Sequence, residues 1–585
     1  MPKNILILNQ TRMGDLVQCT PLIAGLRQKH PDAKITLAVN RSFEEFARKI
    51  LHVDELVVFD IGQYNDQDWS KEVVWVTLVQ YLKKCLDALR GKNFDLVVNL
   101  SHSFLSAYMI KYLQIPEARG FCCNEEGDRK TEHPWFQYFF IEPMNRPYNT
   151  FNLVDIFGRG GDIEPATSGI LVRNGAEDEA AVSGVIETHG IDQDELVIGI
   201  QAGSSIADRR WPASRFAELV DRLIETSNAR TILFGVKSET ELSEQIIGAS
   251  KNPTRIVNLC GQTSITQLIG MLKRCRYLVT NDTGTMHIAA ALGVRIVGLF
   301  FAHAHPAETG PYSAGDLIFR ANIACAPCSY HVHCSNVICV DKVQPRHVSA
   351  LIHGHLESGR WQVPEFMQHL PEMDLLESYF DEEGYLAYKP LIRHPLAMET
   401  LFSQAYRRMW RDCLMETRET PSEAALKEMG DFLEQHYDVR GEDGLWDRVL
   451  RKQEELHRLL RLLTDGGVTS DKLMQIYGDH GFDKPRIQAL GERIAGIDDA
   501  IRKIGLTHPE LNPLCDMFDR RKENFEGKDL LDLAQRTSDC YRKFKIEALS
   551  LYTVLDSLRE RLAEEDSTGP DQADVSSKRM AVPGR

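Results

Sequence analysis

Over residues 1–170, short apolar runs alternate with amphipathic segments. The apolar runs lie at 4–8, 35–39, 55–59 and 94–100. They are rich in β-branched residues and apolar at consecutive positions, as in parallel strands buried on both faces. In the segments between them, such as 20–30, apolar residues recur at helical spacing. The pattern predicts a parallel sheet with helical crossovers, and surface loops at 60–75 and 120–150.

A second alternation of the same kind begins near residue 195. Its apolar runs lie at 196–200, 230–234, 255–259, 276–280 and 294–300, with helical patterns at 214–226 and 264–274. Two consecutive alternations predict two doubly wound parallel sheets with a cleft between them. We therefore expect an α/β fold with one Rossmann-like domain at 1–175 and a second at 176–355.

Near residue 375 the strand signals give way to long helical patterns. The supporting features are a capping-box pattern with Pro at Thr420-Pro421-Ser422-Glu423, a helical pattern at 445–463 that stops at Gly466, and another at 528–562. They predict a separable all-α extension at 375–565. The tail at 566–585 has no periodicity and is predicted to be disordered.

Composition narrows the classes of protein that fit. The 585 residues carry a formal net charge of −16, which argues against nucleic-acid binding because that function needs a basic face. No apolar stretch approaches the ~20 residues of a membrane span, and the N-terminal apolar run is too short for a secretion signal. The 13 Cys are mostly scattered, which is typical of reduced thiols. We therefore expect a cytoplasmic protein.

Three strand ends carry residues suited to ligand chemistry. After the first strand, Gly14 permits a close turn and Asp15 opens the next helix. Asp15 is either an N-cap, a common role of Asp, or a carboxylate that faces the cleft, where ligands bind in such sheets. The residues alone leave both interpretations open.

The second strand end follows 196–200. Gly203 turns the chain, Ser204 offers a hydroxyl and a backbone N–H, and Arg209 and Arg210 add fixed positive charge before the next helix. Arg suits bidentate contact with phosphate, and the alternative is a solvated surface pair.

The third strand end follows 276–280. Asp282 and Thr283 can cap the next helix, Gly284 lets the backbone approach a ligand, and His287 lies in the first turn. A helix N-terminus presents unpaired backbone N–H groups and the positive end of the helix dipole. We interpret this strand end as a phosphate site.

Taken together, the three strand ends resemble the family 9 glycosyltransferases, the ADP-heptose:lipopolysaccharide heptosyltransferases. The matching motifs are Arg12-Met13-Gly14-Asp15 with Thr20-Pro21-Leu22, Arg209-Arg210-Trp211-Pro212, and Asp282-Thr283-Gly284 with Met286-His287-Ile288-Ala289-Ala290-Ala291-Leu292-Gly293. The resemblance covers 1–350 and implies a GT-B fold whose second domain holds a nucleotide diphospho-sugar donor. It implies inverting transfer of heptose or a related sugar, with ADP-heptose the expected donor. The implied acceptor is an envelope lipopolysaccharide or glycolipid at the inner face of the membrane.

The resemblance also implies roles for individual residues. Asp15 is the general base, and Arg209, at a position where the family usually has Lys, neutralises the leaving diphosphate. Ser204 matches a hydroxyl position near the phosphates, and Glu239 matches an acidic residue near the nucleoside ribose. The segment 282–287 completes the donor site, and catalysis needs no metal.

The residues after position 350 have no counterpart in ordinary members of that family, and this leaves the acceptor open. It is either a glycolipid or, as for protein O-heptosyltransferases, a serine of a protein. A non-catalytic nucleotide-sugar-binding scaffold is the third interpretation, and intact Asp15, Arg209 and 282–287 argue against it. The oligomeric state is also open.

A cysteine-rich stretch follows the second alternation. It contains Cys325, Cys328, Cys334 and Cys339, with His331 and His333 between them. Four thiolates can hold a tetrahedral Zn or Fe ion, and they leave no open position for catalysis. A related loop occurs in many members of the family. The stretch 325–339 is therefore either a structural metal clip or a loop of four reduced thiols.

Overall fold

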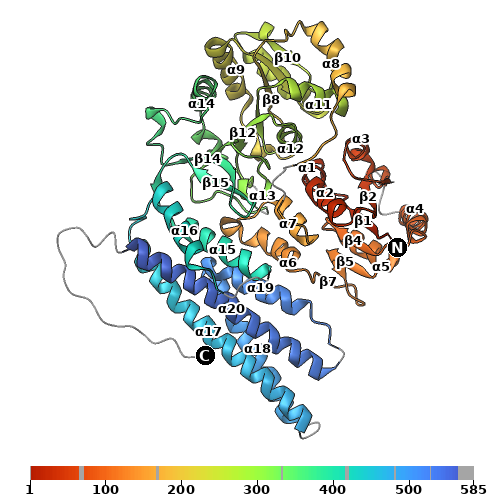
Figure 1. The fold of residues 1–585 in the computed structure, drawn as a ribbon, viewed down its shortest axis with the longest axis vertical. Coiled ribbons are helices and arrows are strands. Elements are labelled where there is room, and N and C mark those ends of the chain that lie inside the picture. Colours follow the sequence, from red (N-terminus) through yellow and green to blue (C-terminus); the bar gives the residue numbers. More distant parts are fainter. Residues whose placement is uncertain are drawn as a thin grey trace, which may run out of the picture.

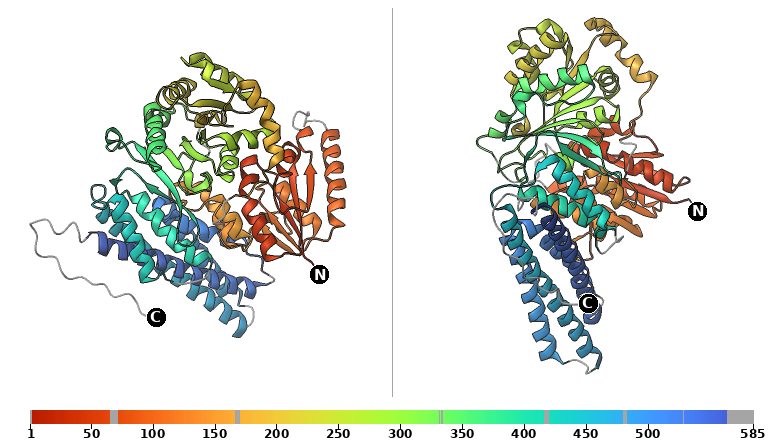
Figure 2. Two further views of the ribbon diagram at one scale, coloured as in Figure 1. Left: turned by 45° about the horizontal axis from the view of Figure 1, so that its top comes forward. Right: turned by 60° about the vertical axis from the view of Figure 1, so that its left-hand side comes forward.

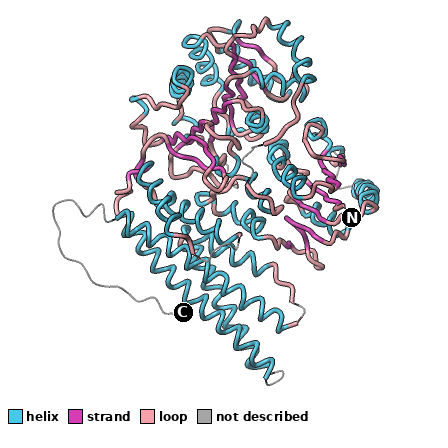
Figure 3. Tube along the Cα trace, viewed as in Figure 1, coloured by secondary structure: helices cyan, strands magenta, loops and turns pink. Residues whose placement is uncertain are grey.

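The computed structural model describes residues 2–64, 72–165, 170–330, 332, 334–415, 420–479, 483–527 and 529–563. The predicted tail at 566–585 lies outside the described residues, as do His331 and His333. Two α/β domains lie side by side, and a long helical part extends away from both of them (Figures 1 and 2). Figure 3 shows the strands confined almost entirely to the α/β part. Within the described ranges, no helix is long and apolar enough to cross a bilayer.

The first domain contains a five-stranded parallel sheet of order β3-β2-β1-β4-β5. The strands are β1 (Asn4–Leu8), β2 (Lys34–Asn40), β3 (Glu55–Phe59), β4 (Leu96–Asn99) and β5 (Glu117–Gly120). Strand β1 is almost fully buried, because helices such as α2 (Thr20–Lys29) and α4 (Glu72–Arg90) cover the sheet. The strand order reverses between β1 and β4, where ligands bind in such sheets. The predicted strands are therefore confirmed.

The second domain contains an eight-stranded sheet of order β10-β9-β8-β11-β12-β13-β14-β15. Its parallel strands are β8 (Val197–Gln201), β9 (Arg230–Phe234), β10 (Ile256–Asn258), β11 (Tyr277–Asn281), β12 (Arg295–Phe300) and β13 (Leu317–Ala321). The flanking helices include α9 (Ala213–Ser227), α10 (Thr240–Ala249), α11 (Ile265–Arg274), α12 (Gly284–Ala291) and α14 (Pro345–Ser358). The order reverses between β8 and β11, so this sheet has a switch point as well. Two Rossmann-like domains are confirmed.

The predicted start of the helical extension at residue 375 is wrong. Strands β14 (Met373–Phe380) and β15 (Leu386–Pro390) extend the second sheet in antiparallel fashion. A tight turn joins them, with Gly384 at φ +85° and the Asp381 amide donating to the Tyr385 carbonyl. These edge strands are buried less uniformly than the parallel ones, so they lack the continuous apolar run used to find strands.

The helical part begins at α15 (Met398–Leu414). It continues with α16 (Glu423–His436), α17 (Leu445–Asp479), α18 (Lys484–Thr507), α19 (Asn512–Glu523) and α20 (Leu530–Ala563). Ser422 is the N-cap of α16, with its hydroxyl accepting from the Ala425 amide, so the cap predicted at Thr420 is wrong. Helix α17 also continues through Gly466. A Cβ there would lie 2.3 Å from the Tyr541 ring, so this glycine allows α17 and α20 to approach closely and does not end a helix.

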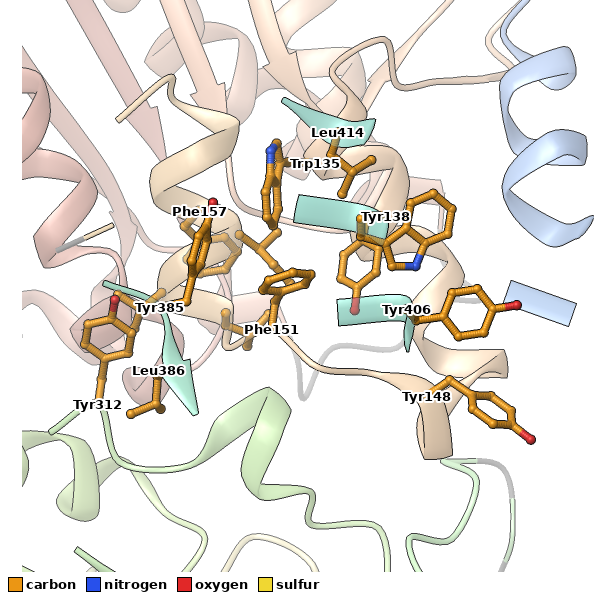
Figure 4. Close-up of a cluster of buried hydrophobic side chains, with 14 of the residues drawn as sticks. Trp135, Tyr138, Tyr148, Phe151, Phe157, Tyr312, Tyr385, Leu386, Tyr406 and Leu414 are labelled. Atoms are coloured by element: carbon orange, nitrogen blue, oxygen red, sulfur yellow. The ribbon is translucent and has the colours of Figure 1, made fainter. Parts of the chain in front are cut away.

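The segment 120–150 was predicted as a surface loop, but its second half, from residue 135 on, is largely buried between the helical part and the α/β domains. Helix α6 (Pro134–Ile141) carries Trp135 and Tyr138, which are 0% and 1% exposed. Figure 4 shows their rings beside Tyr385, which directly precedes β15, and Tyr406 of α15. Trp135 donates its indole N–H to the Met415 sulfur at 3.1 Å. The aromatic cluster thus joins all three parts of the chain, which argues against a separable helical extension.

We expect removal of residues 371–585 to prevent the α/β part from folding stably. The deletion removes β14 and β15 and uncovers Trp135 and Tyr138. Losing the packing of one large aromatic side chain costs about 3–5 kcal/mol, against a typical net stability of about 5–15 kcal/mol. Size-exclusion chromatography and thermal melting test this, with a chain ending at residue 565 as the control. A monodisperse fragment 1–370 that melts cooperatively would contradict the expectation.

Candidate active site

The two α/β domains meet at the N-terminal ends of two helices, α1 (Met13–Gln18) and α12. A Cβ on Gly14 would lie 3.3 Å from a ring carbon of His287. A Cβ on Gly284 would lie 2.8 Å from the Met13 methyl group and 3.3 Å from the Gly14 nitrogen. The two glycines therefore let the first and third sequence motifs approach closely, at the switch point of each sheet.

Asp15 lies in the first turn of α1, and the N-cap residue is Arg12. The Asp15 carboxylate accepts a hydrogen bond from the Arg12 amide at 3.3 Å, a long contact, and the Asp15 side chain is half-buried. Burial lowers the pKa of His287 and of His102, and in both cases the negative charge of Asp15 opposes the shift. Asp15 is therefore near two imidazoles, one from each domain, and its position is not that of an N-cap.

Arg209 and Asp282, predicted as separate donor-site residues, form a buried ion pair at 2.7 Å. The Arg209 Nε donates to Nε2 of His303 at 2.9 Å, which requires that nitrogen to be unprotonated. Burial, reinforced by the positive charges of Arg209 and Arg146, lowers the pKa of His303 to about 4, so the ring is neutral at neutral pH. The Arg209 guanidinium is thus fixed in orientation by two directed contacts.

Ser204 lies in the turn after β8 and is buried. Its carbonyl accepts from Nε of Arg210 at 2.8 Å, so Arg210 stabilises the turn and is not a free surface cation. Asn281, at the end of β11, donates to the Ala202 carbonyl at 2.7 Å and accepts from the Trp211 amide at 3.3 Å. These contacts tie together the ends of the two strands at the switch point.

The N-terminus of α12 lacks the predicted side-chain cap. Thr283 is the N-cap residue but makes no side-chain capping hydrogen bond, because its hydroxyl lies 3.3 Å from that of Thr280. The Asp282 carboxylate is turned to Arg209. Neither Thr283 nor Asp282 therefore competes with a ligand for the first-turn N–H groups of α12. His287 is 3% exposed, and its Nδ1 is buried without a partner in the described part of the chain.

Glu239 lies over the ends of β8 and β9. A Cβ on Gly203 would fall 1.9 Å from its carboxylate, and one on Gly235 would fall 2.9 Å from it. The carboxylate accepts from the Val236 amide at 3.1 Å and from the Gln201 amide group at 3.2 Å. Glu239 is therefore held at the carboxyl edge of the second sheet, on the same side as the Ser204 turn.

The cysteine-rich loop is anchored to the end of β12. The Cys328 amide donates to the Ala302 carbonyl at 3.0 Å, and the Cys339 sulfur accepts from the Ala302 amide at 3.4 Å. Burial, together with the nearby thiols of Cys325, Cys339 and Cys334, raises the pKa of Cys328 to about 11. Among the residues described, no group of three or more candidate ligands has a metal-holding arrangement. The metal clip remains a prediction.

A buried polar network beside Arg209 was not predicted from the sequence. Arg146, from the turn after α6, forms an ion pair with Glu308 at 3.0 Å, and both side chains are at least 95% buried. Glu308 also accepts from Asn149 at 2.7 Å and from the Tyr330 hydroxyl at 3.0 Å. Arg146 lies in the segment expected to be a surface loop, and no strand-end pattern marks it. Only the tertiary fold brings it to the donor side.

A comparison with protein-family models matches residues 172–336 to Glycosyltransferase family 9 (heptosyltransferase). The chain carries a family 9 glycosyltransferase domain. This domain contains the Ser204 turn, the Arg209–Asp282 pair, Glu239 and the start of α12. The resemblance inferred from the strand ends is therefore confirmed for residues 172–336, which form the domain of a family 9 glycosyltransferase.

Individual relatives are heptosyltransferases. Lipooligosaccharide heptosyltransferase 2 of Haemophilus ducreyi is 24% identical over 327 residues, covering 54% of this chain and 88% of the relative. A family 9 glycosyl transferase structure from Veillonella parvula has a TM-score of 0.49 at 22% identity, covering 61% of this chain and 98% of its own. The structure of the E. coli heptosyltransferase WaaC with ADP-2-deoxy-2-fluoro heptose has a TM-score of 0.41 at 17% identity, covering 60% and 99%.

We expect Arg209→Met to destabilise the family 9 domain by leaving Asp282 buried without its partner. Breaking a buried pair costs about 3–5 kcal/mol, which corresponds to a fall in Tm of roughly 10 °C. The double variant Arg209→Met with Asp282→Asn should recover part of this loss, because it removes the orphaned charge. Differential scanning calorimetry of the three proteins tests the coupling. Single and double variants with equal Tm would show that the two residues do not act as a pair.

Proposed function

We propose that the protein transfers heptose from ADP-heptose to a hydroxyl group of an envelope lipopolysaccharide or related glycolipid, with inversion at the anomeric carbon. The observation that carries this proposal is the junction of α1 and α12. It sets a carboxylate of the first domain, Asp15, against a helix N-terminus and His287 of the family 9 domain. A base and an anion site on opposite sides of one junction suit displacement of a diphosphate by a hydroxyl.

The donor side supports a nucleoside diphosphate. The first-turn N–H groups of α12 and the guanidinium of Arg209 are two positive elements near one another, linked through Asp282. We assign the diphosphate to these groups and to the Ser204 turn, and the ribose to Glu239. Because Arg209 is already paired, it orients the leaving group more than it adds net charge.

On the acceptor side, the hydroxyl oxygen attacks the anomeric carbon as the bond to the diphosphate breaks. The proton of the hydroxyl passes to the Asp15 carboxylate, and ADP leaves with its negative charge stabilised by α12 and Arg209. Burial lowers the pKa of His287, so this imidazole is neutral and can hydrogen-bond without competing for the charge of Asp15. The proposed chemistry uses no metal ion.

A protein hydroxyl is the second candidate acceptor. The observation behind it is that the helical part packs against the first domain. Helix α19 and the residues after it contact the first domain beside the β6–β7 hairpin (Cys122–Cys123 and Arg129–Lys130). Lys130 pairs with Glu526 at 2.7 Å, and the Thr131 amide donates to Asn524 at 2.7 Å.

Incubation with ADP-heptose and either heptose-deficient lipopolysaccharide or a cell protein extract separates the two acceptors. No turnover with either acceptor would favour the scaffold interpretation.

We expect Asp15→Asn to lower kcat by about 10²–10⁴-fold, the usual contribution of a general base. Asn keeps the size of the side chain and its acceptor oxygen for the Arg12 amide, so ADP affinity and Tm should change little. Initial rates of ADP release and calorimetric titration with ADP measure the two quantities. Normal turnover by the Asn variant would exclude Asp15 as the base.

We further propose that Cys325, Cys328, Cys334 and Cys339 hold one structural Zn or Fe ion. The basis is the sequence, in which four Cys within residues 325–339 can supply a tetrahedral set of thiolate ligands. Elemental analysis of protein purified without a His-tag should give about one ion per chain, and Cys328→Ser with Cys339→Ser should abolish it. Metal-free protein of unchanged Tm contradicts the site. Turnover that requires an exchangeable metal contradicts its structural assignment.

A further inference from the structure

A chain of polar contacts runs from the helical part to the donor side. It starts at α19, where the Asn512 side chain donates to Oδ1 of Asn145 at 2.7 Å. Asn145 is 2% exposed and donates to the Ile141 carbonyl at 2.8 Å, and its amide nitrogen lies 3.3 Å from the Asp516 carboxylate. The side chain of Asn145 is thus fixed from both sides, by α19 and by the end of α6.

The next residue, Arg146, continues the chain into the family 9 domain. Its Nη2 donates to the His303 carbonyl and forms the ion pair with Glu308 at 3.0 Å. The Tyr330 ring covers the guanidinium at 4.0 Å, and the ring of Tyr330 meets that of His303 edge-on at 5.4 Å. Arg146 therefore contacts both the backbone of His303 and the ring that packs against its imidazole.

His303 in turn accepts the hydrogen bond from Nε of Arg209 at 2.9 Å. A guanidinium has a planar fork, so a shift of either acceptor rotates every N–H that it presents. Asp282 fixes one branch of the Arg209 fork, and His303 fixes the other. The direction in which Arg209 can meet a phosphate consequently depends on where His303 is held.

We propose that Arg146 is a positioning residue for the donor diphosphate, held in place by α19 through Asn145. This inference rests on the proposed function, which assigns the diphosphate to Arg209. Stability alone does not account for Arg146, because its Nε and Nη1 are buried without hydrogen-bond partners among the described residues. Such orphaned donors cost stability. The role also gives the helical part a task in donor binding, although it lies outside the matched range 172–336.

The test compares ADP with adenosine, since only ADP uses the diphosphate contacts. Arg146→Met keeps the length of the side chain and removes the fork. It should weaken ADP binding about tenfold, the loss of roughly one charge-assisted hydrogen bond, and leave adenosine binding unchanged. Isothermal titration calorimetry with the full chain measures both constants. A general structural defect would weaken both ligands together.

Helix α19 offers a matched pair of asparagines for the second arm. Asn512 contacts Asn145 on the proposed path, whereas Asn524, just after α19, accepts from the Thr131 amide on the same interface but off the path. We expect Asn512→Ala to weaken ADP binding about two- to threefold and Asn524→Ala to leave it unchanged. Because both are mild changes on the same face, this arm remains decisive even where Arg146→Met fails to fold.

Each outcome supports or overturns a stated claim. Selective loss of ADP affinity in Arg146→Met and in Asn512→Ala supports the positioning role. Unchanged ADP affinity in both, or equal loss for ADP and adenosine, overturns it while the proposed function stands. Equal effects of Asn512→Ala and Asn524→Ala on ADP affinity overturn the claim that α19 holds Arg146 in place. A wild-type chain that does not bind ADP overturns the proposed function, and the positioning role with it.

Discussion

The structure depends on the burial of one aromatic segment against all three parts of the chain. Trp135 and Tyr138 of α6 pack with Phe151, while Tyr385 comes from the β14–β15 turn of the second domain and Tyr406 from the helical part (Figure 4). Buried aromatic contacts of this size are among the largest single contributions to a protein core. They fix the relative position of the two sheets, and hence the distance between Asp15 and the start of α12 on which any shared chemistry depends.

The predictability of the fold follows from where each element lies. Strand β1 and strand β11 are covered on both faces, so their sequences are continuous apolar runs that identify them without other information. Strands β14 and β15 lie at a sheet edge, and α6 is buried by elements distant in sequence. Nothing local distinguishes them from a helix start or an aromatic loop. The helix end predicted at Gly466 was wrong for a similar reason. The side chain that this glycine makes room for, Tyr541, belongs to another helix.

The residues of the candidate site also differ in whether the local sequence could predict them. Asp15, Arg209 and His287 follow predicted strands, so the rule that ligands bind at strand ends located them, and the tertiary structure brings them close together. Their partners were not predictable. That Asp282 pairs with Arg209 instead of capping α12 depends on a contact across 73 positions of sequence. Arg146, Glu308 and His303 acquire their environment only when α6 packs against the second domain.

Helix α15 contacts both α/β domains, and these contacts limit how far the domains can move relative to each other. Arg407 of α15 donates to the Thr150 carbonyl of the first domain at 2.6 Å and pairs with Asp381 beside β14 of the second at 2.6 Å. The side chains of Arg407 and Asp381 are 10% and 9% exposed, so a hinge rotation of one domain against the other would strip the Arg407 charge of its partners. A large rotation of the two domains against each other is therefore opposed by the buried contacts that this one helix makes with both of them. In the proposed reaction, ligand exchange would then depend on local loop motions, which are faster than the swing of whole domains.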